Sequence, residues 1–298
     1  MENNQNKKIG FEDLKPTEIA NADSVRDRFV EILTAIQKLS EKEAASIYER
    51  EALYFTKAVK ANKRLQNCTN ISLYSAFLEI AITGLSIQPG SKSEAFLEAR
   101  SANIGTKDSP KWENSALLQV TAYGELNMRI RSGQIVRMSN PIVIYDGDHF
   151  QPYTTPRGEL TIDYKPAIPR KSNTIVGCWV AITLPGNGID FKWLLKDDIE
   201  RLKKASIPKT GESKNPAALY SSNNGQIDSG FLEAKTIKHA MRSYTKLRVG
   251  EGVSFEEDID TAEANETDDN PFGDNTNETV NVETVSFGGN ENDLEEIF

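Results

Sequence analysis

Four cations recur at helical spacing near the end of the basic part of the chain. If residues 228–248 form one helix, Lys235, Lys238, Arg242 and Lys246 fall within about 80° of arc at 100° per residue. No acid lies on the same stripe, and apolar side chains gather on the opposite side, namely Ile237, Ala240, Met241, Tyr244 and Leu247. Such a stripe either keeps an amphipathic helix soluble or binds phosphates, and the lack of an interleaved acid favours phosphate binding.

A second group of residues has the form of a metal nuclease site. Asp148 is followed by Asp163 and Lys165. In the D…[DE]-x-K pattern, two carboxylates on neighbouring strands hold Mg²⁺ and the lysine orients the attacking water. This pattern is short and common by chance. Asp148 also follows the turn pair Asp146-Gly147 directly, where an aspartate is favoured for local hydrogen bonding, so a turn residue is the competing interpretation.

The sequence lacks the motifs that other kinds of catalysis require. No GxxxxGK[ST] phosphate loop occurs, and Gly186-Asn187-Gly188 is typical of a hairpin turn, so nucleotide hydrolysis has no site in this sequence. The two histidines, His149 and His239, are not close in sequence to a cysteine or to each other. This spacing disfavours a zinc site or a serine triad. We therefore expect a protein that works without ATP.

The net charge of −9 averages two unlike parts of the chain. Residues 255–298 hold 15 of the 44 acids and none of the 35 bases, so residues 1–254 carry a net charge of +6. A basic body can collect polyanions, and an acidic segment can compete for the same surface. The charge pattern thus indicates a polyanion as the partner.

Composition also predicts the compartment. No window approaches 18 consecutive apolar residues and residues 1–10 are polar, so we expect neither a membrane span nor a secretory signal, and a cytoplasmic protein. Cys68 and Cys178 lie 110 positions apart without CxxC spacing, which predicts two reduced thiols packed as small hydrophobes. With 298 residues and 38% hydrophobic content, the chain can bury a real core.

Apolar periodicity predicts three helices in the N-terminal part, after a loosely ordered segment of residues 1–22. Ser24 and Asp27 match a capping box at the start of the first helix. Gly84 follows the third helix, where a left-handed residue ends a helix at little cost. The three helices are expected at residues 24–39, 41–63 and 71–83.

After the third helix the apolar period changes from 3.6 towards 2, which predicts strands. Residues 95–99 and 117–121 are expected to pair as a hairpin with a long, mostly basic tip that holds Lys111. Residues 123–132 fit either a strand or a helix. Further strands are expected at residues 134–138, 141–145, 160–164, 175–184 and 189–195, and the last two should form the centre of a small sheet.

The region before the basic helix is expected to be a loop. A short helix over residues 197–204, capped by Asp197 or Asp198, precedes residues 205–228, which are rich in Ser, Asn, Gly, Pro and Lys. We expect this long loop, with Tyr220 as its one aromatic residue, to be mobile. From residue 255 onward, an acidic composition that is poor in large apolar residues predicts a flexible tail.

A series of short motifs, taken in their order along the chain, points to a particular protein family. In chain order they are Ala81-Ile82-Thr83-Gly84-Leu85, Ala95-Phe96-Leu97, Tyr123-Gly124-Glu125-Leu126, Arg131-Ser132-Gly133, Gly147-Asp148-His149-Phe150, the apolar strand at 175–182, and Glu233-Ala234-Lys235-Thr236-Ile237-Lys238 with Arg242. In this order and spacing, over about residues 25–250, the chain resembles the phage RecT family of single-strand annealing proteins. It departs from the family's pattern at Tyr164-Lys165-Pro166 and in residues 217–220, so these positions inherit no role.

The resemblance implies an α+β fold. Its parts are a helical N-terminal part, a β-hairpin and small antiparallel sheet packed with helices, a basic C-terminal helix and a disordered acidic tail. It favours helix for residues 123–132. The chain then divides into a flexible N-terminus (1–22), a DNA-binding, annealing and oligomerisation domain (23–250) and an acidic disordered tail (251–298).

The resemblance also implies a function in phage homologous recombination and DNA repair. Proteins of this family bind single-stranded DNA without ATP, pair complements into an annealed duplex and assemble into rings or helical filaments. The expected partners are a 5′–3′ exonuclease and the host single-strand-binding protein in the bacterial cytoplasm. Because such proteins anneal and do not cut, the resemblance argues against the nuclease built on Asp148, Asp163 and Lys165. A plain interaction scaffold with an incidental basic face is the third hypothesis.

The predicted DNA-binding residues form an oligomeric basic groove. Neutralising phosphates releases counterions and lets two complementary strands approach each other. The groove residues are expected to be Arg129, Arg131, Lys235, Lys238, Arg242, Lys246, Lys111 and Tyr123. Tyr123, Trp112 and Tyr220 offer rings for base stacking, although burial is the commoner fate of a tyrosine. We expect no catalytic residue, no metal site and no required cofactor, with Mg²⁺ at most modulating DNA binding.

Two stretches of the acidic tail are similar to the Phe-ended tips of bacterial single-strand-binding proteins. They are residues 268–272, Asp-Asp-Asn-Pro-Phe, and residues 293–298, Asp-Leu-Glu-Glu-Ile-Phe. Such a tip either folds back on the basic groove as a decoy, docks on the basic pocket of a partner, or only keeps the chain soluble.

Overall fold

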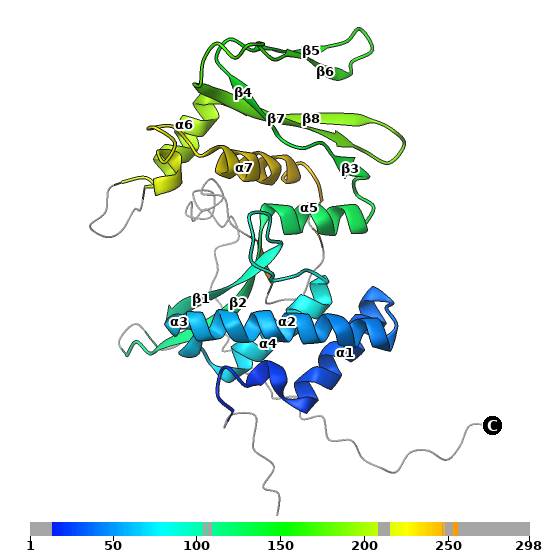
Figure 1. The fold of residues 1–298 in the computed structure, drawn as a ribbon, viewed down its shortest axis with the longest axis vertical. Coiled ribbons are helices and arrows are strands. Elements are labelled where there is room, and N and C mark those ends of the chain that lie inside the picture. The colour runs from blue at the N-terminus through cyan, green and yellow to red at the C-terminus, as the bar shows by residue number, and fades with distance from the viewer. Residues whose placement is uncertain are drawn as a thin grey trace, which may run out of the picture.

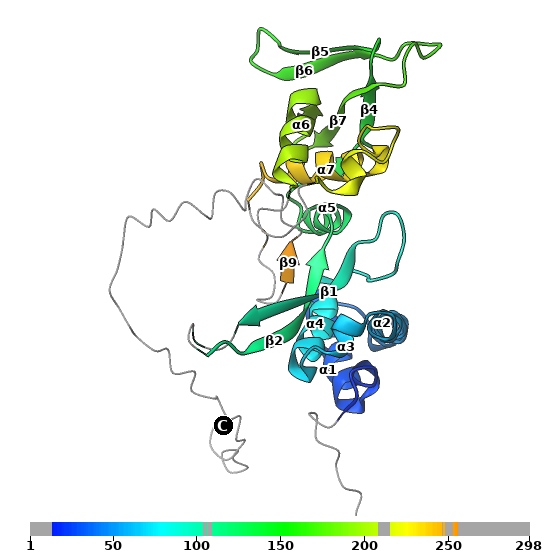
Figure 2. The same cartoon turned by 90° about the vertical axis from the view of Figure 1, so that its left-hand side faces the viewer.

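The computed structural model describes residues 14–103, 106, 109–207, 215–245, 247 and 253–255. The chain forms an elongated molecule of two parts, stacked along its long axis with helix α5 (Ala122–Arg131) between them (Figure 1). The first part combines the N-terminal helices with one sheet. The second combines another small sheet with two helices and a hairpin (Figure 2). This arrangement of helices and small, mainly antiparallel sheets confirms the α+β fold class.

The three predicted N-terminal helices are confirmed, with a short break in the second at Asn62. Ile19 and Ala20 are buried ahead of the first helix, and the Tyr48 hydroxyl donates to the Ala20 carbonyl at 2.7 Å. Residues 14–22 therefore pack with the core, whereas residues 1–13 lie outside the described residues. The elements are η2 (Ile19–Asn21), α1 (Asp23–Gln37), α2 (Glu41–Ala61), α3 (Lys63–Gln66) and α4 (Asn70–Thr83).

Local capping sets the ends of α2 and α4. The Ser40 hydroxyl accepts from the backbone N–H of Glu43, and the Glu43 carboxylate accepts in return from the backbone N–H of Ser40. This capping box satisfies donors that the first turn of a helix leaves unpaired. Gly84 ends α4 as predicted, with a left-handed φ of 62°.

The start of α1 differs from the prediction. The expected capping box of Ser24 and Asp27 is wrong, because α1 begins one residue earlier and Ser24 lies within its first turn. The backbone N–H groups of Val25 and Arg26 both donate to the carbonyl of Ala22 at 3.0 Å. The buried η2 turn leads directly into α1, so tertiary burial of the preceding residues overrides the local capping signal.

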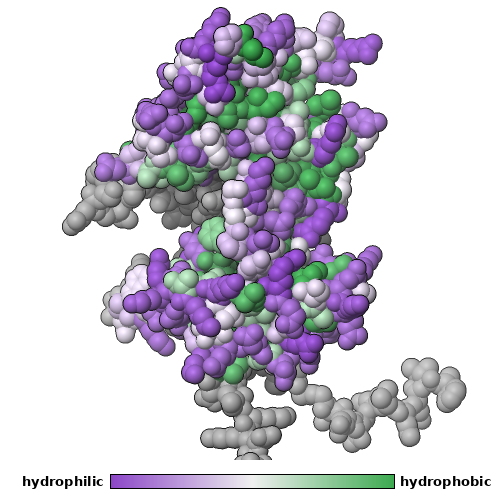
Figure 3. Space-filling view, in the orientation of Figure 1, coloured by the Kyte–Doolittle hydropathy of each residue, from purple (hydrophilic) through white to green (hydrophobic). Residues whose placement is uncertain are grey.

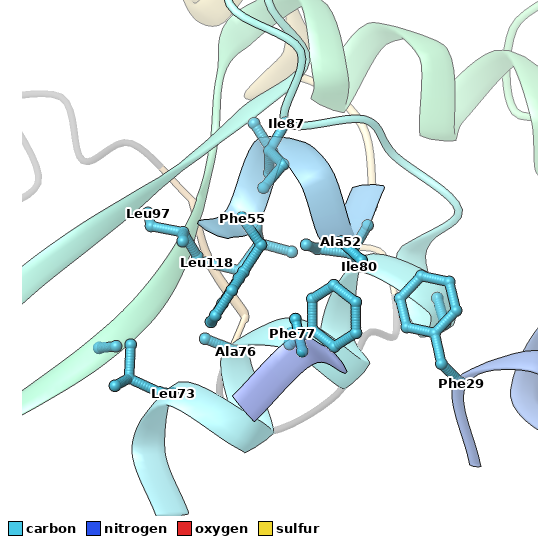
Figure 4. Close-up of a cluster of buried hydrophobic side chains, with 14 of the residues drawn as sticks. Phe29, Ala52, Phe55, Leu73, Ala76, Phe77, Ile80, Ile87, Leu97 and Leu118 are labelled. Atoms are coloured by element: carbon cyan, nitrogen blue, oxygen red, sulfur yellow. The ribbon is translucent and has the colours of Figure 1, made fainter. Parts of the chain in front are cut away.

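Aromatic packing holds α1, α2 and α4 together. Phe77 of α4 stacks on Phe29 of α1 with ring centroids 4.6 Å apart and meets Phe55 of α2 edge-on at 4.9 Å. All three rings are fully buried. The same cluster continues through Leu73 to Leu118 of the first sheet (Figure 4). The helices thus cover one face of that sheet.

The first sheet is the predicted hairpin with a third strand. β1 (Ala95–Asn103) and β2 (Trp112–Val120) pair antiparallel along their full length. On its other side, β2 pairs in parallel with β9 (Val253–Phe255), and Val120 lies opposite Phe255 (Figure 2). The prediction of a disordered tail from residue 251 is wrong for these three residues. The predicted flexible tail at 256–298 lies outside the described residues.

Residues 123–132, whose sequence fitted either a strand or a helix, lie almost entirely within helix α5. The Thr121 hydroxyl caps its start by accepting from the Gly124 N–H at 3.2 Å, and donates to the Ser93 carbonyl at 2.6 Å. A side chain at position 124 would collide with the Glu94 carbonyl oxygen. Glycine therefore lets α5 lie directly against the start of β1.

β7 (Ile175–Thr183) is the central strand of the second sheet, as predicted. It pairs antiparallel with β8 (Ile189–Leu195) on one side and with β4 (Ile142–Tyr145) and β3 (Arg137–Met138) on the other. One face of this sheet is covered by the predicted short helix α6 (Lys196–Ala205), by η3 (Ala218–Tyr220) and by α7 (Ser229–Met241) (Figure 1).

A second hairpin, β5 (His149–Thr154) with β6 (Leu160–Lys165), lies beyond the other face of this sheet (Figure 1). Only β6 was predicted. β5 contains Pro152 and few apolar residues, so its sequence lacks the alternation that marks a strand. Its Phe150 packs against Trp179 and Trp193, with centroids 6.4 and 6.2 Å apart, and this tertiary contact holds the strand in place.

α7 is shorter than the predicted helix over 228–248. Asp228 caps its start by accepting from the Phe231 N–H at 2.9 Å. The helix ends at Met241. Leu247 packs against the core of the first part. The chain therefore leaves the helix in order to return to the N-terminal half.

Both cysteines are free and buried, which confirms that they pack as small hydrophobes. Burial raises the pKa of the Cys178 thiol to about 12. Burial also raises the pKa of Cys68. Both side chains therefore stay protonated at neutral pH.

Replacing Phe77 with alanine should lower the free energy of unfolding by about 3–5 kcal/mol, because it leaves a cavity against two other rings. Ile71→Ala on the same helix is the control. Ile71 is 61% exposed, so its loss should cost no more than about 1 kcal/mol. Urea unfolding followed by circular dichroism measures both. Equal losses would contradict the assignment of Phe77 to the core.

Candidate nucleic-acid interface

Helices α5 and α7 meet through a buried ion cluster. Arg129 donates from Nε to Oε1 of Glu125 at 3.0 Å, and Nζ of Lys238 lies 3.6 Å from the other carboxylate oxygen of Glu125. None of the three side chains is more than 10% exposed. The i,i+4 spacing places Glu125 and Arg129 on one face of α5. One carboxylate thus compensates two cations at the junction of the two parts.

Arg129 is saturated by further protein partners. Its Nη1 donates to the Gln134 side chain at 2.6 Å and to the Thr245 carbonyl at 2.9 Å, and its guanidinium lies 5.9 Å from the ring centroid of Tyr244. A buried cation with these partners does not present its charge to a phosphate at the surface. The expectation that Arg129 and Lys238 lie on an open DNA-binding face is therefore corrected, because they join α5 to α7.

The predicted stripe of four cations is not one surface. Lys238 faces α5, Nζ of Lys235 lies 5.2 Å from the ring centroid of Phe231, and Arg242 is exposed at the C-terminal end of α7. Lys246 lies outside the described residues. The physical reason is that α7 is covered on two sides, by the second sheet and by α5. A helical wheel shows only one buried side.

Arg131 points towards the first part of the molecule. Its guanidinium donates to the carbonyls of Gly84 at 3.0 Å and Thr83 at 2.6 Å. These carbonyls lie at the C-terminal end of α4, where a cation suits the helix dipole. Gln37 of α1 donates to the Ile82 carbonyl at 3.0 Å in the same place. Arg131 remains exposed and connects α5 to the end of α4.

A cavity of about 790 Å³ opens beside Arg131. It lies between α1, α2, the end of α4 and the segment 84–94, and its rim carries three cations, Arg50, Lys92 and Arg131. Figure 3 shows the face of the molecule in the orientation of Figure 1, with a narrower level between the two parts. With this volume, the basic cavity can hold part of a nucleic-acid strand.

The acids near the basic cavity are engaged by local donors. Glu51 is fully buried and accepts from the Ser86 hydroxyl at 2.8 Å, the Ile87 N–H at 3.0 Å and Nε of Arg50 at 2.8 Å. Glu94 lines the cavity and accepts from the Ser86 N–H at 2.8 Å. Glu51 thereby holds the segment after α4 and forms an ion pair with the guanidinium of Arg50. The rim keeps a net positive charge.

Two of the three rings predicted to stack on bases, those of Tyr123 and Trp112, are at least partly exposed. Nζ of Lys92 lies 5.7 Å from the ring centroid of Tyr123, whose pKa is raised by burial. Trp112 is 68% exposed at the tip of the first hairpin. Tyr220 is buried and packs edge-on against Phe231 at 5.1 Å, so its ring is not open to a base.

The predicted site residues therefore fall into separate groups. Arg131 and Tyr123 lie at or beside the basic cavity. Lys111 is exposed at the hairpin tip, and the nine-residue strands of that hairpin extend for about 30 Å. Lys111 and Arg131 thus cannot contact the same nucleotide within one subunit. Their DNA-binding roles stay predictions.

Sequence reasoning missed Arg50 and Lys92. Lys92 lies in a polar segment without periodicity, which gives no indication of which side chains it will face. Arg50 precedes Glu51, an acid at helical spacing with the buried Tyr48 and Phe55. An acid on an apolar stripe predicts a buried polar network, and that signal was available at this position.

The nuclease pattern does not assemble around Asp148. Its Oδ2 accepts from the Tyr145 N–H at 3.0 Å and the Tyr164 hydroxyl at 3.2 Å, and its Oδ1 accepts from the Ala167 N–H at 2.8 Å. Partial burial raises the pKa of Asp148, but these hydrogen bonds outweigh it and the net shift is downward. The geometry is that of the turn residue in the competing interpretation.

Asp163 and Lys165 lie on the exposed strand β6. The Asp163 carboxylate accepts from Nζ of Lys165 at 3.1 Å and lies 3.2 Å from Nε2 of His149. The hydrogen bond from Lys165 is the main cause that lowers the pKa of Asp163. Among the described residues, no group of three or more His, Cys, Asp or Glu side chains is placed to hold a metal ion.

Replacing Glu125 with glutamine should lower the free energy of unfolding by about 3–5 kcal/mol, because two buried cations then lose their shared counter-charge. Glu98→Gln is the matched control. Glu98 pairs with Arg100 at 3.2 Å with both side chains about 40% exposed, so its loss should cost at most about 1 kcal/mol. Urea titrations measure both. A mild effect at position 125 would show that the cluster does not join the helices.

Comparison with known proteins identifies the family. A search of the curated proteins finds no match. In the described ranges, no helix is long and apolar enough to cross a membrane. A model of the RecT family matches residues 54–271, well over half of the chain. The match begins within α2 and includes α5, both sheets and α7. The chain therefore belongs to the RecT family of DNA-binding, single-strand annealing proteins of phage recombination.

Proposed function

We propose that this protein anneals complementary DNA strands without ATP, on a basic surface that is repeated from subunit to subunit. The observation that carries the proposal is the basic cavity beside α5, with Arg50, Lys92 and Arg131 on its rim. We assign these three cations to phosphate contacts. We assign Arg242 and Lys235 on α7, and Lys111 on the hairpin, to separate, additional contacts along the strand.

Electrostatics supports this mechanism. Two complementary strands repel each other through their phosphates, and each cation that neutralises a phosphate releases a condensed counterion. If the three rim cations contact one phosphate each, single-strand binding should show a log–log salt slope of about −2 per subunit. Sequence is then read by base pairing alone, and the same surface holds the annealed duplex. Tyr123 and Trp112 offer rings for stacking of unpaired bases.

The proposed annealing requires neither ATP hydrolysis nor a cofactor. Annealing is downhill once repulsion is screened, because base pairing supplies the free energy. The sequence offers no phosphate loop for ATP. Mg²⁺ enters only as a counterion that modulates DNA binding.

The N-terminal helices are the proposed subunit contacts. Ile36 of α1, Leu53 of α2 and Ile71 of α4 are each more than half exposed. Exposed large apolar side chains on neighbouring helices are typical of surfaces that another protein covers. We infer that these helices bring basic cavities of successive subunits into a ring or filament, so that one strand can follow them.

The proposed setting is the cytoplasm of a phage-infected bacterium. Annealing consumes single strands, so a 5′–3′ exonuclease that exposes them is the expected partner. Host single-strand-binding protein coats the same strands and is the second expected partner. Both partners are what membership of the family implies, and they fit a reaction that requires single strands to be produced and protected.

Lys92→Ala should reduce the salt slope of single-strand binding by about 0.7, because one phosphate contact per subunit is lost. Lys204→Ala is the control, since Lys204 is exposed on α6, away from the basic cavity. Fluorescence anisotropy of a labelled oligonucleotide over a salt series measures both slopes. Identical slopes for the two variants would remove the cavity from the DNA site.

Annealing itself has a direct readout. Two labelled complementary oligonucleotides, mixed with the wild-type protein in the absence of ATP, should form duplex faster than they do alone. Lys92→Ala should slow this gain. Unchanged renaturation rates with wild-type protein would overturn the annealing proposal. Shortening of the labelled DNA in Mg²⁺, abolished by Asp163→Ala, would favour the nuclease instead.

A further inference from the structure

The basic cavity has an apolar floor that phosphate binding does not explain. Leu33, Ile80 and Leu85 line it as buried side chains, and Leu39 and Ile47 line it half-buried. Leu39 and Ile47 are only partly covered, and partly exposed apolar side chains beside three cations are suited to a ligand that carries both acids and large apolar groups. A DNA backbone supplies only the acids.

One segment of this chain has that composition. Residues 293–298, Asp-Leu-Glu-Glu-Ile-Phe, carry three acids and three large apolar residues. The three acids equal the rim cations in number, and Leu294, Ile297 and Phe298 are suited to the apolar floor. The other Phe-containing acidic stretch, residues 268–272, has two acids and one large apolar residue beside a proline. It matches the cavity less well.

The last described strand, β9, ends at the same end of the first sheet as the segment that lines the cavity. β9 runs parallel to β2, and β2 leads into α5. Phe255 therefore ends β9 beside Val120, at the α5 end of the sheet (Figure 2). The Thr121 hydroxyl, one residue further, donates to the carbonyl of Ser93, which lines the cavity. Phe255, the last described residue, is thus one strand away from the end of β1 that follows the cavity-lining segment 84–94.

Chain length permits the contact. Residues 256–292 separate β9 from the segment 293–298. Fully extended, this connection reaches roughly 120 Å at about 3.3 Å per residue, many times the width of a sheet whose strands lie about 5 Å apart. A connection within one chain also gives the segment a high effective concentration, of millimolar order for a flexible linker.

We propose that the basic cavity docks residues 293–298 of the same chain. Their acids pair with Arg50, Lys92 and Arg131, and their apolar side chains lie on the floor formed by α1, α2 and α4. Because DNA uses the same cations, the docked segment lowers DNA affinity until a strand displaces it. Only this competition rests on the proposed function. The docking itself does not depend on it.

A peptide experiment tests the docking without DNA. The probe is a fluorescein-labelled peptide of residues 290–298, added to the full chain at low salt. The variant Leu294→Ser/Ile297→Ser/Phe298→Ser should bind the probe roughly tenfold more tightly than wild type, because the competing segment of the chain no longer occupies the cavity. These substitutions leave β9 and the described core untouched. A probe with the same three serines should not bind.

Charge reversal at the rim identifies the site. In the triple-serine background, Lys92→Glu should weaken probe binding roughly fivefold, whereas Lys204→Glu on α6 should leave it unchanged. Equal effects of the two reversals, or no probe binding to any variant, would overturn the proposal. If the wild-type protein binds the probe more weakly as the protein concentration rises, the competing segment comes from a second copy. The same-chain assignment is then wrong.

DNA affinity then tests the competition. At low salt the triple-serine variant should bind a labelled single strand more tightly than wild type, and the difference should shrink as salt rises. Equal DNA affinities together with confirmed probe binding would leave the docking in place and overturn its regulatory effect. Failure of DNA binding in all variants would count against the proposed function and would leave the peptide result standing.

Discussion

The structure depends on the buried charge cluster between α5 and α7. Glu125 faces two cations, Arg129 from its own helix and Lys238 from the next. Charges of this kind tolerate burial only when their partners are held in place. The cluster therefore requires a fixed contact between the helices, and this contact joins two parts that otherwise have separate sheets and separate apolar cores.

The basic cavity follows from that constraint through helical geometry. Residues two apart on a helix point about 200° away from each other. With Arg129 turned towards α7, Arg131 must turn towards the end of α4, where it contacts the carbonyls of Thr83 and Gly84. The same helix thus uses one arginine to hold the second part and the next to shape the cavity. Position in space, not residue type, separates a structural cation from one available to DNA.

The difference between structural cations and rim cations is also where prediction of the site from the sequence stopped. Patterns with local causes were read correctly, including the turn at Gly84 and the central strand β7. The family resemblance identified α5 as a helix. The site was harder, because a helical wheel assumes one buried face and α7 has two. Lys238 therefore looked like a surface cation. Lys92 carries no local signal and Arg50 only the buried acid beside it, since tertiary packing of the helices and segment 84–94 brings both to one rim.

The cations of the chain likewise differ in whether other parts of the protein cover them. Partners within the protein already satisfy Arg129, whereas the rim cations Arg50, Lys92 and Arg131 remain accessible. A surface that binds any DNA sequence gains no selectivity from its phosphates, so its occupancy is set by whichever polyanion is nearby. The parallel pairing of β9 with β2 ties the start of the acidic part of the chain to the first sheet. Under the docking proposed above, this covalent connection makes residues 293–298 the nearest competitor for the rim cations, and DNA that engages several subunits would displace them.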